Sequence, residues 1–382
     1  RQRQMCIRDS DNSATTVVCE EAAKKAYYIM TEKYGNPSSL HTLGFEAAKE
    51  LEAARDVIAG SLSVSPTEIF FTSGGTESNN TAVFGAVNAL KRRGNRIVTT
   101  AIEHSSVVEA AEKLKKDGYE VIFLEPDESG AIPKEKFINA INSDTILVSV
   151  MAVNNETGII QPIKLVSNII SKSGSPALFH CDAVQAFGKV NLKPQKLGVD
   201  LMSISSHKIH GPKGVGALYI RKGARIVPLH YGGEQERKIR PGTESLPLIC
   251  AFAEAVKALP NIDDQHEKIE ELWNYCKEKV LEIPNVYINS PDGVLPYILN
   301  ISAVGVRSET MLHYLAESGI YVSSGSACAK GKKSHVLTAM GLSPERIDSA
   351  IRISFSKFNT KDDIDIFAEK LAEGMKNLAK SR

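Results

Sequence analysis

The sequence carries almost no net charge, and its charges are not gathered in one place. It has 46 lysines and arginines against 45 aspartates and glutamates, which gives a formal net charge of +1. No basic stripe suggests a nucleic-acid partner, and no polybasic run suggests binding to anionic lipid. Long apolar runs are also missing, because no stretch approaches the roughly 18 residues of a membrane-spanning helix. The chain has 382 residues, which is long enough for one large and one small domain.

Paired cysteines and a recognisable leader are missing as well. The six cysteines form no CxxC pair and show no zinc-ligand spacing: Cys6, Cys19, Cys181, Cys250, Cys276 and Cys328. In a chain of this size, that pattern predicts free thiols and a cytoplasmic location. Residues 1–10 have neither periodicity nor the apolar core of a signal peptide. They are expected to be a disordered tail, or a foreign end that replaces the natural start.

Predicted strands and helices alternate along the chain, as in an open α/β sheet. Strands are expected near residues 67–71, 96–100, 120–124, 145–153, 177–181, 199–204, 215–220, 285–289, 297–301, 320–322 and 350–355. Helices are expected over residues 20–34, 44–61, 133–141, 246–258, 263–281, 308–318 and 360–379, and after the polar segments 73–80 and 103–106.

Lys208 occupies a short polar loop between the apolar runs 199–204 and 215–220. A lysine held between buried strands loses solvation, which disfavours its charged form and leaves a nucleophilic amine, as a Schiff-base lysine requires. The alternative is an ordinary solvated lysine in a surface loop. The neighbours favour the first interpretation, because serines and His207 precede the lysine and glycines follow it.

Residues 73–80 read Ser-Gly-Gly-Thr-Glu-Ser-Asn-Asn and stand between a predicted strand and a predicted helix. A glycine turn that leads into a helix presents backbone N–H groups and the positive end of the helix dipole, which suits an anion. Thr76 can add a hydroxyl donor. The segment lacks the Gly-Lys-Ser/Thr of a P-loop. The alternative is a capped helix that follows a turn.

Polar residues also follow three other predicted strands, where an open α/β sheet carries its ligand crevice. They are Glu103-His104, the segment Asn154–Gly158, and Asp182 with Gln185. A carboxylate at a buried strand end needs a partner, and a protonated ring nitrogen would serve Asp182. A helix N-cap for Asp182 and an ordinary turn for Asn154–Gly158 are the alternatives. His180 lies inside its strand and is expected to be packed rather than catalytic.

The segment 323–334 is small, polar and basic, which predicts an exposed and mobile loop. It contains Cys328 together with Lys330, Lys332 and Lys333, and nearby positive charge lowers the pKa of a thiol. Arg352 follows in an apolar strand and needs an anionic partner there, for which a substrate carboxylate is suitable.

Taken in order, these motifs resemble the cysteine desulfurases of the class V aminotransferase group, which are pyridoxal-phosphate enzymes of fold type I. The resemblance covers the chain from about residue 11 and is of the longer-loop group. It implies that Lys208 forms the internal aldimine with the cofactor and that Cys328 attacks the substrate sulfur. The resemblance also implies that His104 stacks on the cofactor ring, that Asp182 pairs with the ring nitrogen, and that Gln185 and Asn155 contact the ring hydroxyl and the substrate side. It implies that the cofactor phosphate is bound by Thr76, Ser205 and His207, with Thr243 of a second subunit. Arg352, with Asn155, is expected to bind the substrate carboxylate.

The resemblance also implies an architecture and partners. We expect an α/β fold with a mostly parallel seven-stranded sheet between helices and a smaller α+β C-terminal domain. The expected divisions are an N-terminal arm (1–15), a large cofactor-binding domain (16–258) and a small domain with the cysteine loop (259–382). L-cysteine, a second copy of the chain and a sulfur-acceptor protein are the expected partners, and no metal is expected. A selenocysteine lyase or a small-amino-acid aminotransferase is the alternative activity.

Overall fold

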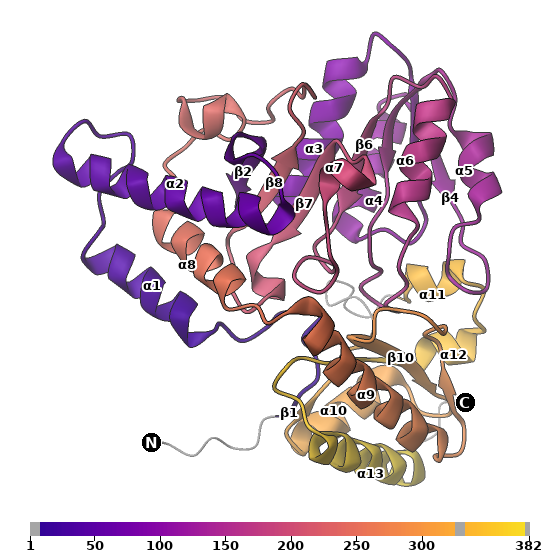
Figure 1. The fold of residues 1–382 in the computed structure, drawn as a ribbon. Helices are drawn as coiled ribbons and strands as arrows, with labels where there is room; N and C mark the ends of the chain where they lie inside the picture. The colour runs from indigo at the N-terminus through magenta and orange to yellow at the C-terminus, as the bar shows by residue number, and fades with distance from the viewer. Residues whose placement is uncertain (1–7, 325–332, 379–382) are drawn as a thin grey trace.

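The computed structural model describes residues 8–324 and 333–378, and its largest element is a seven-stranded sheet (Figure 1). The strand order is β2-β8-β7-β6-β5-β3-β4. In that order the strands span Ile69–Thr72, Gly216–Ile220, Leu201–Ser205, Leu178–Asp182, Thr145–Ser149, Arg96–Thr100 and Glu120–Leu124. β8 is antiparallel to both of its neighbours, whereas the other pairs are parallel. The predicted mostly parallel sheet of seven strands is therefore confirmed.

Helices cover both faces of this sheet. Successive strand residues send their side chains to opposite faces, so strands that are apolar throughout present two apolar faces for helices to cover. Ile97 and Leu178 belong to the core on one face, while their neighbours Val98 and Phe179 belong to the core on the other. The first face is covered by α3 (Gly75–Leu90) and α4 (Ser105–Lys116), and the second by α2 (Thr42–Leu62), α5 (Lys134–Ala140), α6 (Ile163–Lys172) and α8 (Leu246–Lys257). Burial on both faces explains why these strands are apolar throughout rather than alternating.

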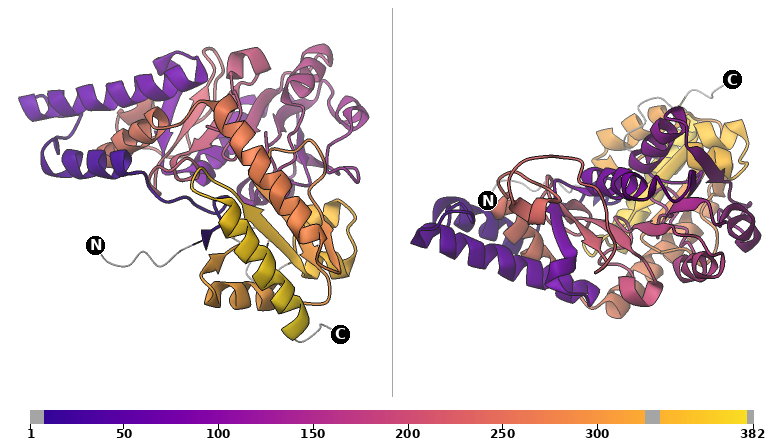
Figure 2. Two further views of the ribbon diagram at one scale, coloured as in Figure 1. Left: turned by 60° about the horizontal axis from the view of Figure 1, so that its bottom comes forward. Right: turned by 90° about the horizontal axis from the view of Figure 1, so that it is seen from above.

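A helical arm extends beyond the sheet on one side (Figures 1 and 2). It consists of α1 (Glu20–Thr31) and α2, and both helices pack on α8. The segment between α1 and α2 closes on itself at Gly44, where a Cβ would come within 2.1 Å of the Ser39 carbonyl oxygen. A larger residue there would displace the backbone at Ser39.

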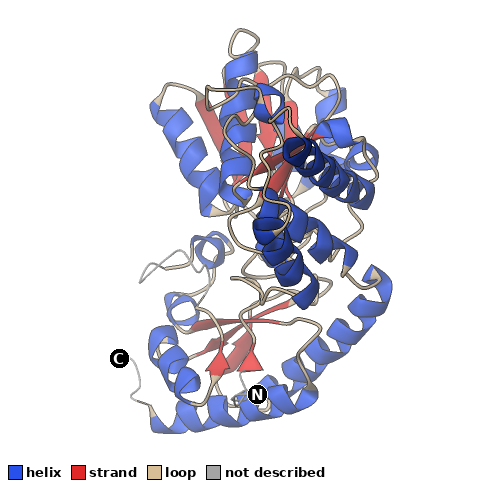
Figure 3. Ribbon diagram, turned by 90° about the vertical axis from the view of Figure 1, so that its left-hand side faces the viewer, coloured by secondary structure: helices blue, strands red, loops and turns tan. Residues whose placement is uncertain are grey.

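A smaller antiparallel sheet lies below the larger one in Figure 3. Its strand order is β12 (Ala350–Ser354), β10 (Ile298–Ala303) and β9 (Val286–Ile288). The helices that accompany it are α9 (Ile262–Leu281), α10 (Ser308–Glu317) and α13 (Lys361–Asn377). This is the expected smaller α+β part of the fold. The division at residues 258 and 259 stays a prediction.

Residues 8–10 contradict the expectation of a patternless tail. Arg8–Asp9 form a strand, β1, which pairs in parallel with β11 (Ile320–Tyr321). The N–H of Ser10 donates to the Tyr321 carbonyl, and the Ser10 carbonyl accepts from the N–H of Ser354. A short strand can be held by a distant partner without any periodicity of its own, so the expectation was wrong for these residues. Residues 1–7 lie outside the described part of the chain.

Several short elements were not expected from the sequence. They are α7 (Pro194–Leu197), α11 (His335–Ala339) and α12 (Pro344–Asp348), together with 3-10 turns at Pro66–Glu68, Ser206–Lys208 and Gln235–Lys238. Elements of three to five residues are too short to show a repeat of apolar positions. In residues 8–324 and 333–378, no helix is both long and apolar enough to cross a membrane, and Cys19, Cys181, Cys250 and Cys276 are free thiols.

Candidate active site

Lys208 ends a 3-10 turn, η2 (Ser206–Lys208), that follows β7 directly. Its ammonium donates to the backbone carbonyls of Ser13 and Ala14, at 2.8 Å for Ala14. Burial, together with the nearby cations of Arg352 and Lys189, lowers the pKa of Lys208 to about 7, against the opposing effect of Asp11 and Asp182. A neutral, nucleophilic amine is therefore available near neutral pH, as the sequence predicts.

A pocket of about 210 Å³ opens above this lysine, at the ends of the parallel strands. It brings together nine of the predicted site residues: Thr76, His104, Asn155, Asp182, Gln185, Ser205, His207, Lys208 and Arg352. Ser13, Ala14, Gly75, Asn79, Met151 and Val184 complete its lining. Residues from five predicted polar segments thus meet in one place.

The Asp182 carboxylate lies at the end of β6 and is held by two donors. Its Oδ2 accepts from the Asn79 amide at 2.7 Å, and its Oδ1 accepts from the N–H of Val184 at 3.0 Å. The same Asn79 amide nitrogen donates to Ser106 Oγ at 2.8 Å. Asp182 is therefore fixed in orientation as well as position. Sequence analysis missed Asn79, although the residue belongs to the glycine-rich segment that attracted attention.

His104 precedes α4 and caps it, because its Nδ1 accepts from the N–H of Ser106. Since Nδ1 accepts, the ring proton lies on Nε2 in the neutral form. Burial lowers the pKa of His104, Asp182 raises it, and proximity to Lys208 and His335 lowers it. The result is a neutral imidazole on one wall of the pocket.

The opposite end of the pocket has the features of an anion site. α3 begins at Gly75, and the hydroxyl of Ser205 is buried there without a hydrogen-bond partner in the described residues. A Cβ on Gly75 would come within 2.8 Å of Val184 Cγ2, so only glycine leaves this turn room against the strand ends. His207 lies beside it, and burial lowers the pKa of its ring to about 4. Backbone N–H groups and an unused hydroxyl suit a phosphate.

Arg352 is 1% exposed, and its guanidinium is shared between two partners. One nitrogen donates to the Asn155 carbonyl at 2.9 Å and another to Asp11 Oδ1 at 2.8 Å, while Nε is buried with no partner among the described residues. Arg352 thus has an anionic partner, as predicted, but this partner is Asp11 of the same chain and not a substrate carboxylate. Sequence analysis did not foresee this pair, because its members are 341 residues apart.

Thr243 is not among the described residues that line this pocket. Thr243 lies in the loop 230–243, which lines a separate and open surface hollow. Cys328 lies outside the described residues, so its assignment stays a prediction.

His180 and Glu103, which neighbour the site residues in sequence, are fully buried. His180 contacts Ser149 and Ser203 through its two ring nitrogens, which confirms that it is packed. Burial raises the pKa of Glu103 to about 8.

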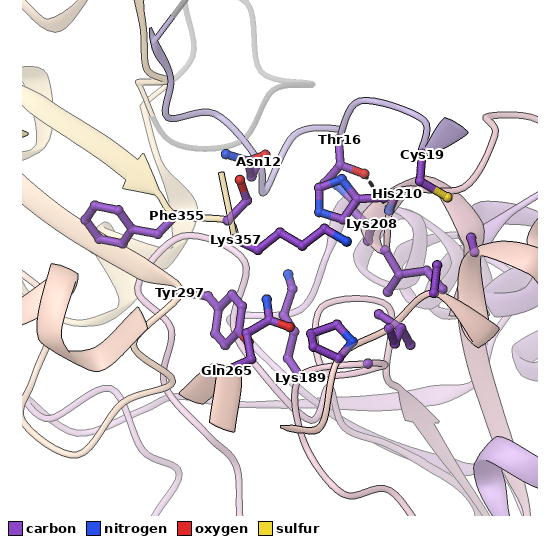
Figure 4. A pocket seen from close by; sticks show the side chains of 17 residues that line it. Asn12, Thr16, Cys19, Lys189, Lys208, His210, Gln265, Tyr297, Phe355 and Lys357 are labelled. Atoms are coloured by element: carbon purple, nitrogen blue, oxygen red, sulfur yellow. Dashed lines mark hydrogen bonds between the residues drawn. The ribbon is translucent and has the colours of Figure 1, made fainter. Parts of the chain in front are cut away.

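A second, smaller cavity lies on the other side of Lys208 (Figure 4). It has a volume of about 30 Å³, enough for about one water molecule. Lys189, Tyr297 and Gln265 line it together with Lys208 and the backbone segment at 355–357. Lys189 was not among the site residues predicted from the sequence.

The pocket fits pyridoxal phosphate by the chemistry of its own residues. Its anion site has an unsatisfied buried hydroxyl, its floor has an amine with a pKa of about 7, and its wall has a fixed carboxylate for a protonated ring nitrogen. The three features lie on the strand ends that a flat, phosphorylated ring would span.

Comparisons with known proteins agree with this arrangement. The family model described as Aminotransferase class-V matches residues 10–367. A cysteine desulfurase IscS of Methanosarcina thermophila is 41% identical over 96% of this chain and 92% of its own length, and one of Clostridium botulinum is 40% identical over 96% and 94%. Among solved structures, a NifS-like protein superposes with a TM-score of 0.91 at 39% identity, covering 97% of this chain and 99% of that one.

A further solved structure, described as SspA in complex with cysteine, has a TM-score of 0.81 at 33% identity and covers 92% of this chain and 100% of its own. The family match and the relatives span nearly the whole chain, including both sheets and the pocket between them. The chain therefore belongs to the class V aminotransferase family, within which its relatives are cysteine desulfurases.

Proposed function

We propose that this protein is a pyridoxal-phosphate-dependent cysteine desulfurase that converts L-cysteine to L-alanine and keeps the sulfur as a persulfide on Cys328. The observation that carries the proposal is the meeting of Lys208, Asp182 and Arg352 in one pocket. A reactive amine, a carboxylate for a ring nitrogen and a guanidinium for a substrate carboxylate are the groups that this chemistry needs. The relatives named above support the choice of reaction.

When bound, pyridoxal phosphate supplies an electron sink for the substrate Cα. Ser205, His207, Thr76 and the start of α3 would hold its phosphate, and Asp182 would keep its ring nitrogen protonated. The neutral ring of His104 would lie against the cofactor, with Gln185 on the hydroxyl side. Each assignment uses a side chain that lines the pocket.

Lys208 serves twice in this proposal. Its neutral amine would hold the cofactor through the cofactor's aldehyde group, and the same amine would accept the proton from the substrate Cα. The backbone carbonyls of Ser13 and Ala14 accept hydrogen bonds from this amine and hold it at the floor of the pocket. The low pKa of Lys208 leaves it able to accept that proton at neutral pH.

Arg352 would bind the substrate carboxylate through Nε, which has no partner among the described residues, while Asp11 and Asn155 hold its other nitrogens. A guanidinium fixed in this way has lost its rotational freedom before substrate arrives. The Asn155 side chain lines the same pocket and would assist.

Cys328 would take the sulfur. Its sulfur forms a bond to the substrate Sγ while the substrate C–S bond breaks; the electron pair stays with the carbon fragment, which takes up a proton and leaves as alanine. Cys328 follows Ser323 by five residues, and Ser323 exchanges two backbone hydrogen bonds with Arg352. Five residues span at most about 18 Å, and this short connection to the substrate-binding strand supports the assignment.

The working unit would be a homodimer in the cytoplasm, with an acceptor protein that collects the sulfur. Large apolar side chains gather, exposed, on the arm formed by α1 and α2: Tyr27, Met30, Tyr34, Leu40, Leu43 and Phe45. Exposed apolar side chains grouped on one arm suit a second copy of the chain. Thr243 stands outside its own pocket, which supports a contribution to the phosphate site of a partner.

The decisive experiment follows the sulfur. Purified protein with pyridoxal phosphate and L-cysteine should produce alanine, and mass spectrometry should find one additional sulfur on Cys328. The Cys328→Ala variant should remain yellow and bind L-cysteine, yet make alanine orders of magnitude more slowly. Additional sulfur on Cys181 or Cys250, or undiminished alanine production by Cys328→Ala, would refute the proposed acceptor, and an amino-group transfer product would favour an aminotransferase.

A further inference from the structure

The smaller cavity behind Lys208 contains a second buried lysine, Lys189 (Figure 4). It follows Gly188, which has φ +76° and on which a Cβ would come within 2.9 Å of Ile209 Cγ2. The N–H of Lys189 donates to the Ala186 carbonyl at 3.0 Å. Its backbone is thus fixed beside the segment that contains Lys208, and the residue is 8% exposed.

The Lys189 ammonium has no carboxylate partner in residues 8–324 and 333–378. Its Nζ lies 3.5 Å from Gln185 Oε1 and 5.4 Å from the centre of the Tyr297 ring. An amide oxygen and an aromatic face are weak compensation for a buried charge. Burying a cation with so little neutralisation destabilises the folded protein, which suggests that Lys189 has a role other than stability.

A chain of polar contacts joins Lys189 to the reactive lysine. Because an ammonium only donates, Lys189 fixes the Gln185 amide with its oxygen towards the cavity. The Gln185 nitrogen then donates to the Ser13 carbonyl at 3.0 Å, and that carbonyl also accepts from Lys208. Reversing the amide would set a nitrogen against the ammonium and an oxygen against the carbonyl.

We propose that Lys189 is a positioning residue for the reaction, which fixes the Gln185 amide and, as a buried cation behind Lys208, favours the neutral form of the Lys208 nitrogen. The proposal rests on the proposed function in one respect, that Lys208 bonds to pyridoxal phosphate. An adjacent cation is an established way to keep a nucleophilic lysine uncharged.

The charged and titratable groups around Lys208 agree with this role. Arg352 and Lys189 disfavour its charged form, whereas Asp11 and Asp182 favour it, and the neighbouring His104 and His207 have lowered pKa values and are neutral. Burial lowers the pKa of Lys189 itself to about 8, with Arg352 contributing. Lys189 is therefore mostly charged at neutral pH, where Lys208 must lose its proton.

The test is a pH titration of the absorption spectrum of the protein loaded with pyridoxal phosphate, without substrate. The pH of the spectral change reports the proton on the nitrogen that joins Lys208 to the cofactor. Lys189→Met keeps the chain length and removes the charge, and it should raise that pH by roughly half a unit or more. Lys189→Arg keeps the charge and should stay close to the wild type.

Equal shifts in both variants, or no shift in Lys189→Met, would overturn the proposal, because a packing role would affect thermal stability and leave the titration in place. If Lys189→Met does not fold, Lys189→Gln is titrated instead, with the same rise expected and the same outcomes decisive. A wild-type protein that gains no colour with pyridoxal phosphate would contradict the proposed function rather than this inference.

Discussion

At the scale of single residues, Lys208 gains its reactivity from where β7 ends rather than from its immediate sequence. Its pKa of about 7 results first from burial and then from two neighbouring cations. The neutral amine is the form that adds to an aldehyde. The fraction in this form increases as pH rises through about 7, whereas an exposed lysine would need a pH near its usual value of about 10.4.

Addition of pyridoxal phosphate to the cofactor-free protein should therefore become faster as pH is raised through about 7 and then level off. The growth of visible absorption after mixing measures this rate, and Lys208→Ala, which lacks the amine, should stay colourless. A rate that keeps rising to about pH 10 would show that Lys208 behaves as an ordinary lysine.

Asn79 provides a second residue-scale prediction. Asn79→Ala removes the donor to Asp182 Oδ2 and to Ser106 Oγ, so the carboxylate loses its orientation. Loss of such a buried contact costs about 1–3 kcal/mol, so the affinity for pyridoxal phosphate should fall roughly ten-fold or more. A fluorescence titration measures the affinity. Asn95→Ala, whose exposed side chain contacts only the Gly118 carbonyl, is the matched control and should bind normally.

At the scale of elements, the turn Asn154–Gly158 connects the two sheets. The Asn154 side chain accepts from the N–H groups of Glu156 and Thr157, which closes the turn. The Glu156 carbonyl accepts from the Asn300 side chain of β10, and its buried carboxylate accepts from Ser334 Oγ at 2.5 Å. Ser334 caps α11, directly after the segment that contains Cys328.

Ser334→Ala should thus slow sulfur transfer without affecting substrate binding. The change removes both the contact to Glu156 and the cap of α11, and a lost cap alone costs about 1 kcal/mol. Stopped-flow mixing with L-cysteine should show a normal binding phase, followed by slower persulfide formation measured by mass spectrometry. Ser343→Ala is the control, because Ser343 precedes α12 without a side-chain cap. Equal slowing of both phases would indicate a general defect instead.

The sequence predicts the elements that carry a repeat and the polar segments that follow them. The strands 96–100 and 120–124 agree with the expected ranges residue by residue. α6 was missed although its apolar positions recur at helical spacing, so that omission was avoidable. β1 and the Asp11–Arg352 pair depend on partners far along the chain, and no local pattern encodes them.

At the scale of the whole molecule, the apolar arm of α1 and α2 predicts that association and cofactor retention are linked. The double variant Met30→Glu, Leu40→Glu places charges on the surface proposed to meet a second copy. It should sediment as a monomer and lose pyridoxal phosphate faster on dialysis, because Thr243 of a partner would be withdrawn. Ile138→Glu, an exposed apolar position on α5, is the control and should leave association unchanged. A monomeric wild type that retains its cofactor would contradict the prediction.

The contacts of residues 8–12 also determine the order in which parts of the structure can form during synthesis. Asn12 donates to the carbonyl of Ser354, 342 residues later. At about 5–20 residues per second, a ribosome needs roughly 20 to 70 seconds to produce that partner. During this interval the seven strands of the large sheet, residues 69–220, can already assemble with Lys208 in place. Asp11 still lacks Arg352 then, so a nascent chain positions Lys208 well before it can bind a substrate carboxylate.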